Sequence, residues 1–160
     1  DVAAPPFVKV VNAESAEDMF NAVTSISDGF DIIIKAAAVS DYTPEFPADY
    51  KIKKSDGDMN IPLKRTKDIL KYLGEHKRAG QFLCGFSMET DNVLDNSRKK
   101  LASKKCDMIC ANSLRGEGSG FGVDTNVISV ITADGVTELG MLSKDDAAHR
   151  ILDIILSMIK

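Results

Sequence analysis

The stretch QFLCGFSMETDNVLDNSRKKLASKKCDMICAN, residues 81–112, decides the fold class. It begins with the short apolar run QFLCGFSM and ends with a second apolar run, CDMICAN. Between them, residues 92–105 form an amphipathic pattern that places Val93, Leu94 and Leu101 on one side of a helix. Two short apolar runs joined by such a helix are typical of buried parallel strands. The stretch therefore predicts a strand–helix–strand unit.

The sequence before this unit continues the alternation of helices and strands. We expect a helix at 13–26, capped by Asn12, followed by a buried strand at 30–39, FDIIIKAAAV. A second helix is expected at 67–77, with Thr66 as its cap. Together these elements predict a layered α/β domain with a mainly parallel sheet.

The C-terminal part predicts an antiparallel edge hairpin and a last helix. Residues 126–132 and 136–142 face each other across an Asp-Gly turn, which is a hairpin pattern. Ser143 and Asp146 have the spacing of a capping box at the start of the helix. The side chains expected to pack inward from this helix are those of Ala147, Ile151, Ile154, Ile155 and Met158.

Composition limits the classes of function. The chain has 160 residues, enough for one domain, and a net charge of -4, so general attraction to nucleic acid or to an anionic membrane is not expected. Its apolar runs are too short to span a bilayer. Its three cysteines lie in apolar stretches, which favours reduced core thiols and a cytoplasmic location. We read His76 and His149 as surface residues.

A lysine cluster is the clearest local concentration of charge. The segments YKIKK (50–54) and MNIPLKR (59–65) flank Ser-Asp-Gly-Asp, which predicts a lysine-rich flap hairpin. In a strand, Lys51 and Lys53 share one face. Three like charges this close, with Lys54 as the third, are either solvated along an edge strand or neutralised by a bound anion. The pattern alone leaves both interpretations open.

Ligands in α/β sheets collect at the carboxyl ends of the strands. At one such end, the small side chains of residues 36–38 allow a ring or ribose to approach the backbone, and Asp41 is either a plain loop cap or a ligand for ribose or magnesium. Lys100 and Lys104 share a helix face, which is usually just a wet surface. The glycine-rich segment 115–122 precedes a strand and not a helix, so we expect a flexible loop instead of a pyrophosphate site.

The motifs AAAVSDYTP, KIKK, TKDIL, GFSMET, SRKKLASKK and DMICAN, in this order, resemble phosphopantothenoylcysteine synthetase. This family is the ligase part of the bacterial bifunctional coenzyme A biosynthesis flavoprotein. The resemblance covers essentially the whole chain and implies a three-layer Rossmann-like fold. It also implies a reaction that joins 4'-phosphopantothenate to cysteine through an acyl-cytidylate, using CTP and Mg²⁺. FMN belongs only to the decarboxylase half, which is absent here. A homodimer is implied as well.

The resemblance also assigns roles to individual residues. It implies that Lys51 acts on the triphosphate during activation and is the catalytic residue. The nucleotide-binding residues that it implies are Ala36, Ala37, Ala38, Asp41, Lys51, Thr66, Lys67, Asp68, Ile69, Phe86, Lys100 and Lys104.

The chain departs from the family at its N-terminal side. Members begin with a strand, a glycine-rich phosphate loop and a later asparagine of the second half-reaction, none of which occurs in residues 1–160. We therefore expect one domain that is the later part of the ligase domain, with uncertain activity in isolation. Two alternatives stay open: a nucleotide-binding or dimerisation module without activity, and a nicotinamide-dependent oxidoreductase. The latter lacks a glycine fingerprint that opens a helix.

Overall fold

The computed structural model of the protein describes residues 4–54, 56–89, 91–113 and 124–159. It divides into two compact units, one made of Asp1–Ser25 with Ala38–Ile69 and the other of Ile26–Ala37 with Leu70–Lys160. The expected glycine-rich loop at 115–122 lies outside the described residues. Among the described residues, no helix has both the length and the apolar character needed to cross a membrane.

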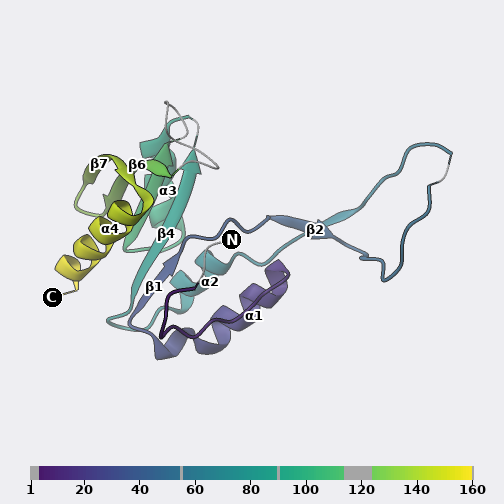
Figure 1. Cartoon of the computed structure of the whole chain (residues 1–160), viewed down its shortest axis with the longest axis horizontal. Helices are drawn as coiled ribbons and strands as arrows, with labels where there is room; N and C mark the ends of the chain where they lie inside the picture. The colour runs from purple at the N-terminus through teal and green to yellow at the C-terminus, as the bar shows by residue number, and fades with distance from the viewer. Residues whose placement is uncertain (1–3, 55, 90, 114–123, 160) are drawn as a thin grey trace. The chain divides into compact units, whose positions relative to one another are not determined.

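The second unit is built on a five-stranded mixed sheet with the order β1-β4-β5-β6-β7 (Figure 1). The strands β1, β4 and β5 are parallel, whereas β6 and β7 pair antiparallel with β5 and with each other. Their bounds are β1 Ile32–Lys35, β4 Phe82–Glu89, β5 Met108–Ser113, β6 Thr125–Thr132 and β7 Val136–Ser143. This arrangement confirms the predicted mainly parallel sheet with an antiparallel edge hairpin.

Helices cover both faces of this sheet, which gives three layers. On one face, α2 (Ile69–His76) brings Leu70 against Gly85, and α3 (Val93–Ser103) is joined to β4 by a 2.8 Å hydrogen bond between the hydroxyls of Ser87 and Ser97. On the other face, α4 (Lys144–Met158) packs its buried side chains on β4, β5 and β6. The buried residues of this second face are Phe82, Cys84, Met108, Cys110, Ile128, Val130, Ala147, Ile151 and Ile155.

The last helix forms much as its sequence predicts. The Ser143 hydroxyl accepts a hydrogen bond from the Asp146 amide at 3.0 Å and donates to the Asp146 carboxylate at 2.6 Å, so the capping box is confirmed. Ala147, Ile151 and Ile155 are buried, and Ile154 is partly buried against the same core. Met158, expected to face inward, is 39% exposed; it is the last residue of the helix.

The expected buried strand at 30–39 is shorter and less buried than predicted. Only Ile32–Lys35 pairs, as β1, and Ile34 is 40% exposed. In the described sheet β1 has β4 as its one neighbour, so its side chains are covered less than those of a central strand.

The first unit contains α1 (Ala16–Ile26) and a small antiparallel sheet of β2 (Tyr42–Pro44) and β3 (Leu63–Arg65). The cap of α1 is Ser15 and not Asn12: the Ser15 hydroxyl accepts from the Asp18 amide, and the Asp18 carboxylate accepts from the Ser15 amide and hydroxyl. Because α1 begins at Ala16, the capping position falls on Ser15, and Asn12 lies three residues before it.

The lysine-rich hairpin exists, but its paired strands differ from the prediction. Tyr42 pairs with Arg65 and Pro44 with Leu63, and residues 45–54 and 56–62 lie in a long arm beyond them (Figure 1). Neither 50–54 nor 59–62 is a strand. Alternation needs a face to bury, and Ile52 in the arm is 57% exposed, so no packing holds these segments in a ladder. The prediction that Lys51 and Lys53 share one face of a strand was therefore wrong.

Candidate functional site

The residues expected to bind a nucleotide are divided between the two units. In the first unit, the structure brings Asp41 and Thr66 together at the base of the hairpin. The Thr66 amide donates to the Asp41 carbonyl at 3.0 Å, and the Thr66 hydroxyl donates to the Ser40 carbonyl at 2.6 Å. Thr66 therefore closes the hairpin, and the helix it was expected to cap begins three residues later, at Ile69. The Asp41 side chain is exposed.

Lys67 follows this base and faces α1. Its ammonium group lies 4.7 Å from the centre of the Phe20 ring and 3.7 Å from a carboxylate oxygen of Glu17. Both side chains of that ion pair are largely exposed, so the pair contributes little to stability. The contacts hold Lys67 near the hairpin base without burying its charge.

Lys51 lies in the arm. Asp41 is at one end of the β2–β3 pair, and the arm continues from the other end. The side chains of Lys51, Lys53 and Lys54 are exposed. Among the described residues, none of the three has a carboxylate within ion-pair distance. The arm therefore presents positive charge that the described fold does not neutralise, which keeps anion binding and simple solvation as its two interpretations.

In the second unit, the expected residues lie on different faces. Ala36 and Ala37 follow the carboxyl end of β1, where the Lys35 ammonium donates to the Ala37 carbonyl at 2.6 Å. Phe86 packs against the core on the α4 face of β4. Lys100 lies in the last turn of α3, which covers the opposite face, and Lys104 is the residue that caps this helix; both are half-buried.

Asn112 is a polar residue at the end of β5 that was not among the expected site residues. It is 9% exposed, and its side-chain oxygen Oδ1 has no hydrogen-bond partner within the described part of the chain. An unpaired buried acceptor is costly, and a ligand with a donor group at this strand end would satisfy it. The signal in the sequence is an asparagine that ends an apolar run.

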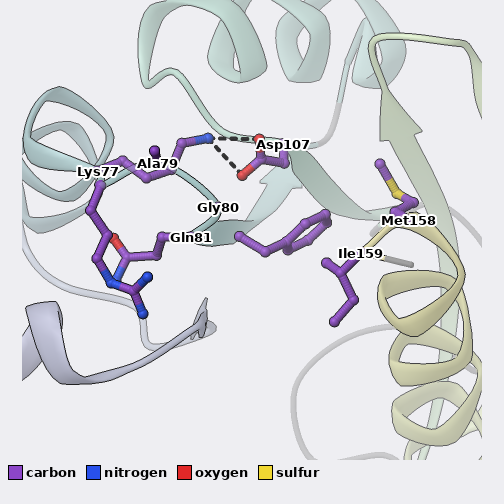
Figure 2. Close-up of a pocket in the computed structure, with 9 residues that line it drawn as sticks. Lys77, Ala79, Gly80, Gln81, Asp107, Met158 and Ile159 are labelled. Atoms are coloured by element: carbon purple, nitrogen blue, oxygen red, sulfur yellow. Dashed lines mark hydrogen bonds and ion pairs between the residues drawn. The ribbon is translucent and has the colours of Figure 1, made fainter.

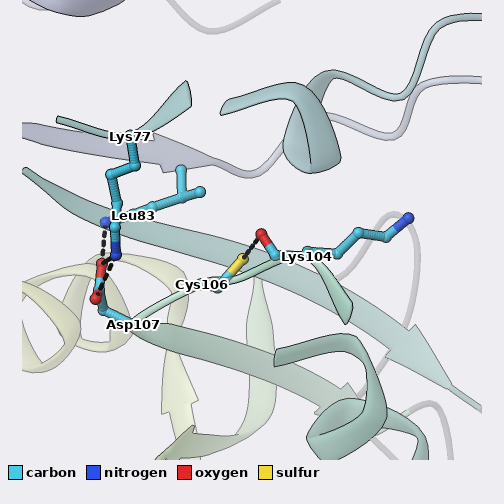
Figure 3. A network of polar contacts seen from close by, with 5 residues as sticks. All are labelled: Lys77, Leu83, Lys104, Cys106 and Asp107. Carbon is cyan, nitrogen blue, oxygen red and sulfur yellow. Dashed lines mark hydrogen bonds and ion pairs between the residues drawn. The ribbon is translucent and has the colours of Figure 1, made fainter. Parts of the chain in front are cut away.

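A polar network ties the amino ends of the central strands together (Figure 3). The Lys77 ammonium donates to both carboxylate oxygens of Asp107, at 2.6 and 2.7 Å, and the Leu83 amide donates to the same carboxylate at 2.7 Å. The Asp107 amide returns a hydrogen bond to the Leu83 carbonyl at 2.9 Å. The ion pair is thus anchored to the backbone of β4.

A pocket of about 500 Å³ lies beside this network (Figure 2). Lys77, Arg78 and Asp107 line one side, and Met158 and Ile159 line the other. It lies at the amino ends of β4 and β5, and none of the expected nucleotide-binding residues lines it. Both cations are already paired, Lys77 with Asp107 and Arg78 with Asp31, so the pocket does not suit a triphosphate.

Cys84 and Cys110 are core thiols, as expected, whereas Cys106 is only partly buried. Cys84 and Cys110 are buried with their sulfurs 3.8 Å apart, and their mutual hydrogen bond together with burial raises the pKa of Cys84. Burial, with the negative charge of Asp107, raises the pKa of Cys106 to about 11. None of these shifts favours a thiolate at neutral pH, so the arrangement does not provide a nucleophile.

The two histidines and the described acidic residues are the side chains to consider for a metal site. His76 stacks on Tyr72 and His149 bonds the Asp145 carbonyl, both on exposed helix surfaces, as expected. Among the described residues, no group of three or more His, Cys, Asp or Glu side chains gathers in a way that could hold a metal ion.

Comparison with known proteins gives the family. Residues 1–159 match the model of the DNA/pantothenate metabolism flavoprotein C-terminal domain. The chain belongs to this flavoprotein C-terminal domain family. Over 151 residues it is 47% identical to the coenzyme A biosynthesis bifunctional protein CoaBC of Bacillus subtilis (strain 168), a match that covers 94% of this chain and 37% of that protein. The chain thus spans well under half the length of this relative.

Solved structures of relatives share the fold of this flavoprotein C-terminal domain. The crystal structure of the C-terminal domain of a coenzyme A biosynthesis bifunctional protein CoaBC is 39% identical, has a TM-score of 0.80, and covers 99% of this chain and 71% of that one. A structure of Cab2 in complex with phosphopantothenate-cysteine is 18% identical with a TM-score of 0.70, covering 90% of this chain and 50% of that one. The predicted family and the Rossmann-like α/β fold are confirmed.

Proposed function

We propose that the protein carrying this chain is a phosphopantothenate–cysteine ligase of coenzyme A biosynthesis. The observation that carries the proposal is the 47% identity, across 94% of the chain, with the bifunctional coenzyme A biosynthesis protein of B. subtilis. The complex of Cab2 with phosphopantothenate-cysteine supports it, because that molecule is the product of the proposed reaction. The relatives that share this flavoprotein C-terminal domain are longer, so the proposal concerns the whole protein.

The proposed reaction uses CTP in two steps. The carboxylate of 4'-phosphopantothenate attacks the α-phosphate of CTP, which gives an acyl-cytidylate and releases pyrophosphate. The amine of cysteine then attacks the activated carbonyl and displaces CMP, which forms the amide. Every reactant of the first step is anionic, so preorganised positive charge is the main assistance that a protein can offer.

In this proposal Lys51 supplies that charge at the triphosphate. Its side chain is exposed in the arm, and no carboxylate among the described residues neutralises it. An ammonium group that is not already paired can lower the barrier of the first step by stabilising charge on the phosphates. Lys100 and Lys104 are proposed as further contacts of the nucleotide.

The remaining contacts that we propose for the nucleotide are those that the resemblance to the ligase family implies. These residues are Ala36, Ala37, Ala38, Thr66, Lys67, Asp68, Ile69 and Phe86. Asp41 is proposed to face the ribose or the magnesium ion of the nucleotide. Mg²⁺ binds through one or two carboxylates plus phosphate oxygens, and the exposed Asp41 carboxylate fits that requirement without a protein cluster. When bound, the magnesium ion would neutralise part of the negative charge on the phosphates of the nucleotide.

We also propose that the protein is cytoplasmic and acts as a homodimer. The exposed apolar side chains of the arm, among them Phe46 at 76% and Tyr50 at 77%, support an arm that is covered in the assembled enzyme. The proposed homodimer concerns the whole protein, and a measurement of the mass of that protein in solution tests it.

Replacing Lys51 tests the proposed chemistry. In the full-length protein, Lys51→Gln should slow CTP- and phosphopantothenate-dependent pyrophosphate release about 100-fold, because one preorganised charge is lost at the phosphates. Lys54→Gln is the matched control, since it removes a neighbouring exposed lysine of the same arm that has no proposed role. Equal release in all three proteins would remove Lys51 from the mechanism. Absence of any CTP-dependent release in the unmodified protein would overturn the ligase proposal itself.

A further inference from the structure

Gly74 is an unusual residue for its place in the fold. It lies within α2 (Ile69–His76) and is buried. A glycine inside a helix is destabilising by about 0.5–1 kcal/mol relative to alanine. A helix that keeps a glycine therefore usually has no room for a side chain at that position. The reason is visible in what an added methyl group would meet.

A methyl group at Gly74 would collide with the end of α3. Its carbon would lie 1.8 Å from the carbonyl oxygen of Lys104 and 2.9 Å from the carbonyl carbon. The next neighbour, the β-carbon of Lys105, would be 3.3 Å away. The two closest atoms belong to the backbone, so no side-chain rotation relieves the contact. Either α2 or the last turn of α3 has to move.

The last turn of α3 holds Lys104 in a fixed orientation. The Cys106 amide donates to the Leu101 carbonyl at 3.0 Å, and the Lys105 amide donates to the Ala102 carbonyl at 3.2 Å. These two bonds, with Lys105 at a φ of 51°, form the Schellman motif that commonly ends a helix. In this turn, the carbonyl group of Lys104 points toward α2. The Cys106 thiol donates to the same oxygen at 3.8 Å.

We propose that Gly74 is a positioning residue for Lys104. By omitting a side chain, it lets the carbonyl of Lys104 dock against α2, which fixes the turn from which the Lys104 side chain extends (Figure 3). The inference rests on the proposed function, in which Lys104 contacts the nucleotide. Gly74 itself touches no substrate and acts only through the α3 turn.

The test compares kinetic constants of variants in the full-length protein. Gly74→Ala should raise the KM for CTP about tenfold or more, because displacing a binding group by a fraction of its length weakens its contact, while the KM for cysteine stays unchanged. A purely structural role would lower the active fraction and the melting temperature without this selective change in KM. Gly29→Ala is the matched control, since a methyl group there meets nothing within 4 Å.

A second pair of variants reaches the same turn without the steric insertion, in case Gly74→Ala does not fold. Lys105→Val places a β-branched residue in the left-handed conformation and should disturb the turn, so it should also raise the KM for CTP. Lys105→Gly removes the same charge but suits that conformation, so it should leave the KM unchanged. Faster alkylation of Cys106 in Gly74→Ala and Lys105→Val would report the movement of the turn directly.

Lys104→Ala distinguishes the two ways in which the idea can fail. If Lys104→Ala raises the KM for CTP and Gly74→Ala adds nothing further in that background, the positioning role is supported. If Lys104→Ala raises the KM while Gly74→Ala and Lys105→Val leave it unchanged, the positioning role alone is overturned. If Lys104→Ala leaves the KM unchanged, the proposed nucleotide contact of Lys104 is wrong, and the inference falls with it.

Discussion

Removing the Asp107 carboxylate should destabilise the protein more than removing any exposed acid. Asp107→Ala deletes the acceptor of the Leu83 amide and both oxygens that hold Lys77. Leu83 is only 1% exposed, so its backbone donor would lose a charged partner where water does not easily replace it. Leaving such a group unpaired costs about 1–3 kcal/mol.

The ion pair adds a smaller amount. The side chains of Lys77 and Asp107 are 23% and 30% exposed, so the pair is partly shielded and contributes about 1 kcal/mol. The sum is about 2–4 kcal/mol, which corresponds to a fall in melting temperature of roughly 5–15 °C for a chain of this size. Asp107→Asn keeps an acceptor for the Leu83 amide and should therefore lose less.

The assay is thermal and urea unfolding of the chain, with Asp31→Ala as the matched control. Asp31 also lies just before a strand and pairs with Arg78, but its side chain is 85% exposed, so its loss should cost less than about 1 kcal/mol. The order Asp107→Ala, Asp107→Asn, Asp31→Ala should hold from the most to the least destabilised. Equal losses at the two aspartates would refute the argument that anchoring to β4 gives Asp107 its importance.

Two further predictions concern α4. Ser143→Ala removes the capping bonds to Asp146 and should lower stability by about 1 kcal/mol, measured as a lower urea midpoint at unchanged slope; Ser143→Asn, which can still cap, should lose less. The hydrogen bond to the Asp145 carbonyl and the nearby Asp145 carboxylate raise the pKa of His149 above 6.5. Its contribution to stability is therefore complete below the unfolded pKa and is lost as the pH rises through the folded value. NMR titration should show the raised pKa, and a His149→Gln variant whose stability follows the same pH profile would contradict this.

The parts of the fold that the sequence predicts well are those in which burial and local chemistry agree. The runs that became β4 and β5 are apolar without alternation, as strands covered on both faces must be. The β6–β7 hairpin has Gly135, the glycine of the Asp-Gly turn that marks it in the sequence, at a φ of 156°, a backbone conformation that other residues rarely adopt. At the start of α4, the capping residue Ser143 and its reciprocal acid Asp146 are both present, so the sequence indicates a single position at which this helix begins.

The predictions failed where local pattern met no packing partner. Alternation in 50–54 predicted a strand, yet Tyr50 there is 77% exposed, and a two-stranded ribbon without a buried face is marginal. Thr66 has the chemistry of a cap, but the hairpin base uses both its amide and its hydroxyl. Such competition depends on residues far apart in the chain, here Ser40 with Thr66, and is not visible in a local window.

The candidate site shows the same limit. Residue types and spacing mark Lys51 and Asp41 as candidates, and both prove exposed, which is a necessary condition for binding an anion or a metal-bound nucleotide. The close approach of Gly74 to the α3 turn leaves no trace in composition or periodicity, because it depends on how two helices pack on one face of the sheet. Steric contacts of this kind require coordinates.

The pairing of the cations differs between the pocket and the arm, and this bears on where a phosphate group could bind. At the pocket, Lys77 already holds Asp107, and that carboxylate also anchors the Leu83 amide, so an anion that captured Lys77 would weaken the sheet. In the arm, no carboxylate of the described residues holds Lys51, so a phosphate that binds there breaks no existing pair. Positive charge assists phosphate chemistry only where it is not already neutralised. Of the two, the arm and not the pocket therefore offers an ammonium group that no carboxylate of the described residues holds.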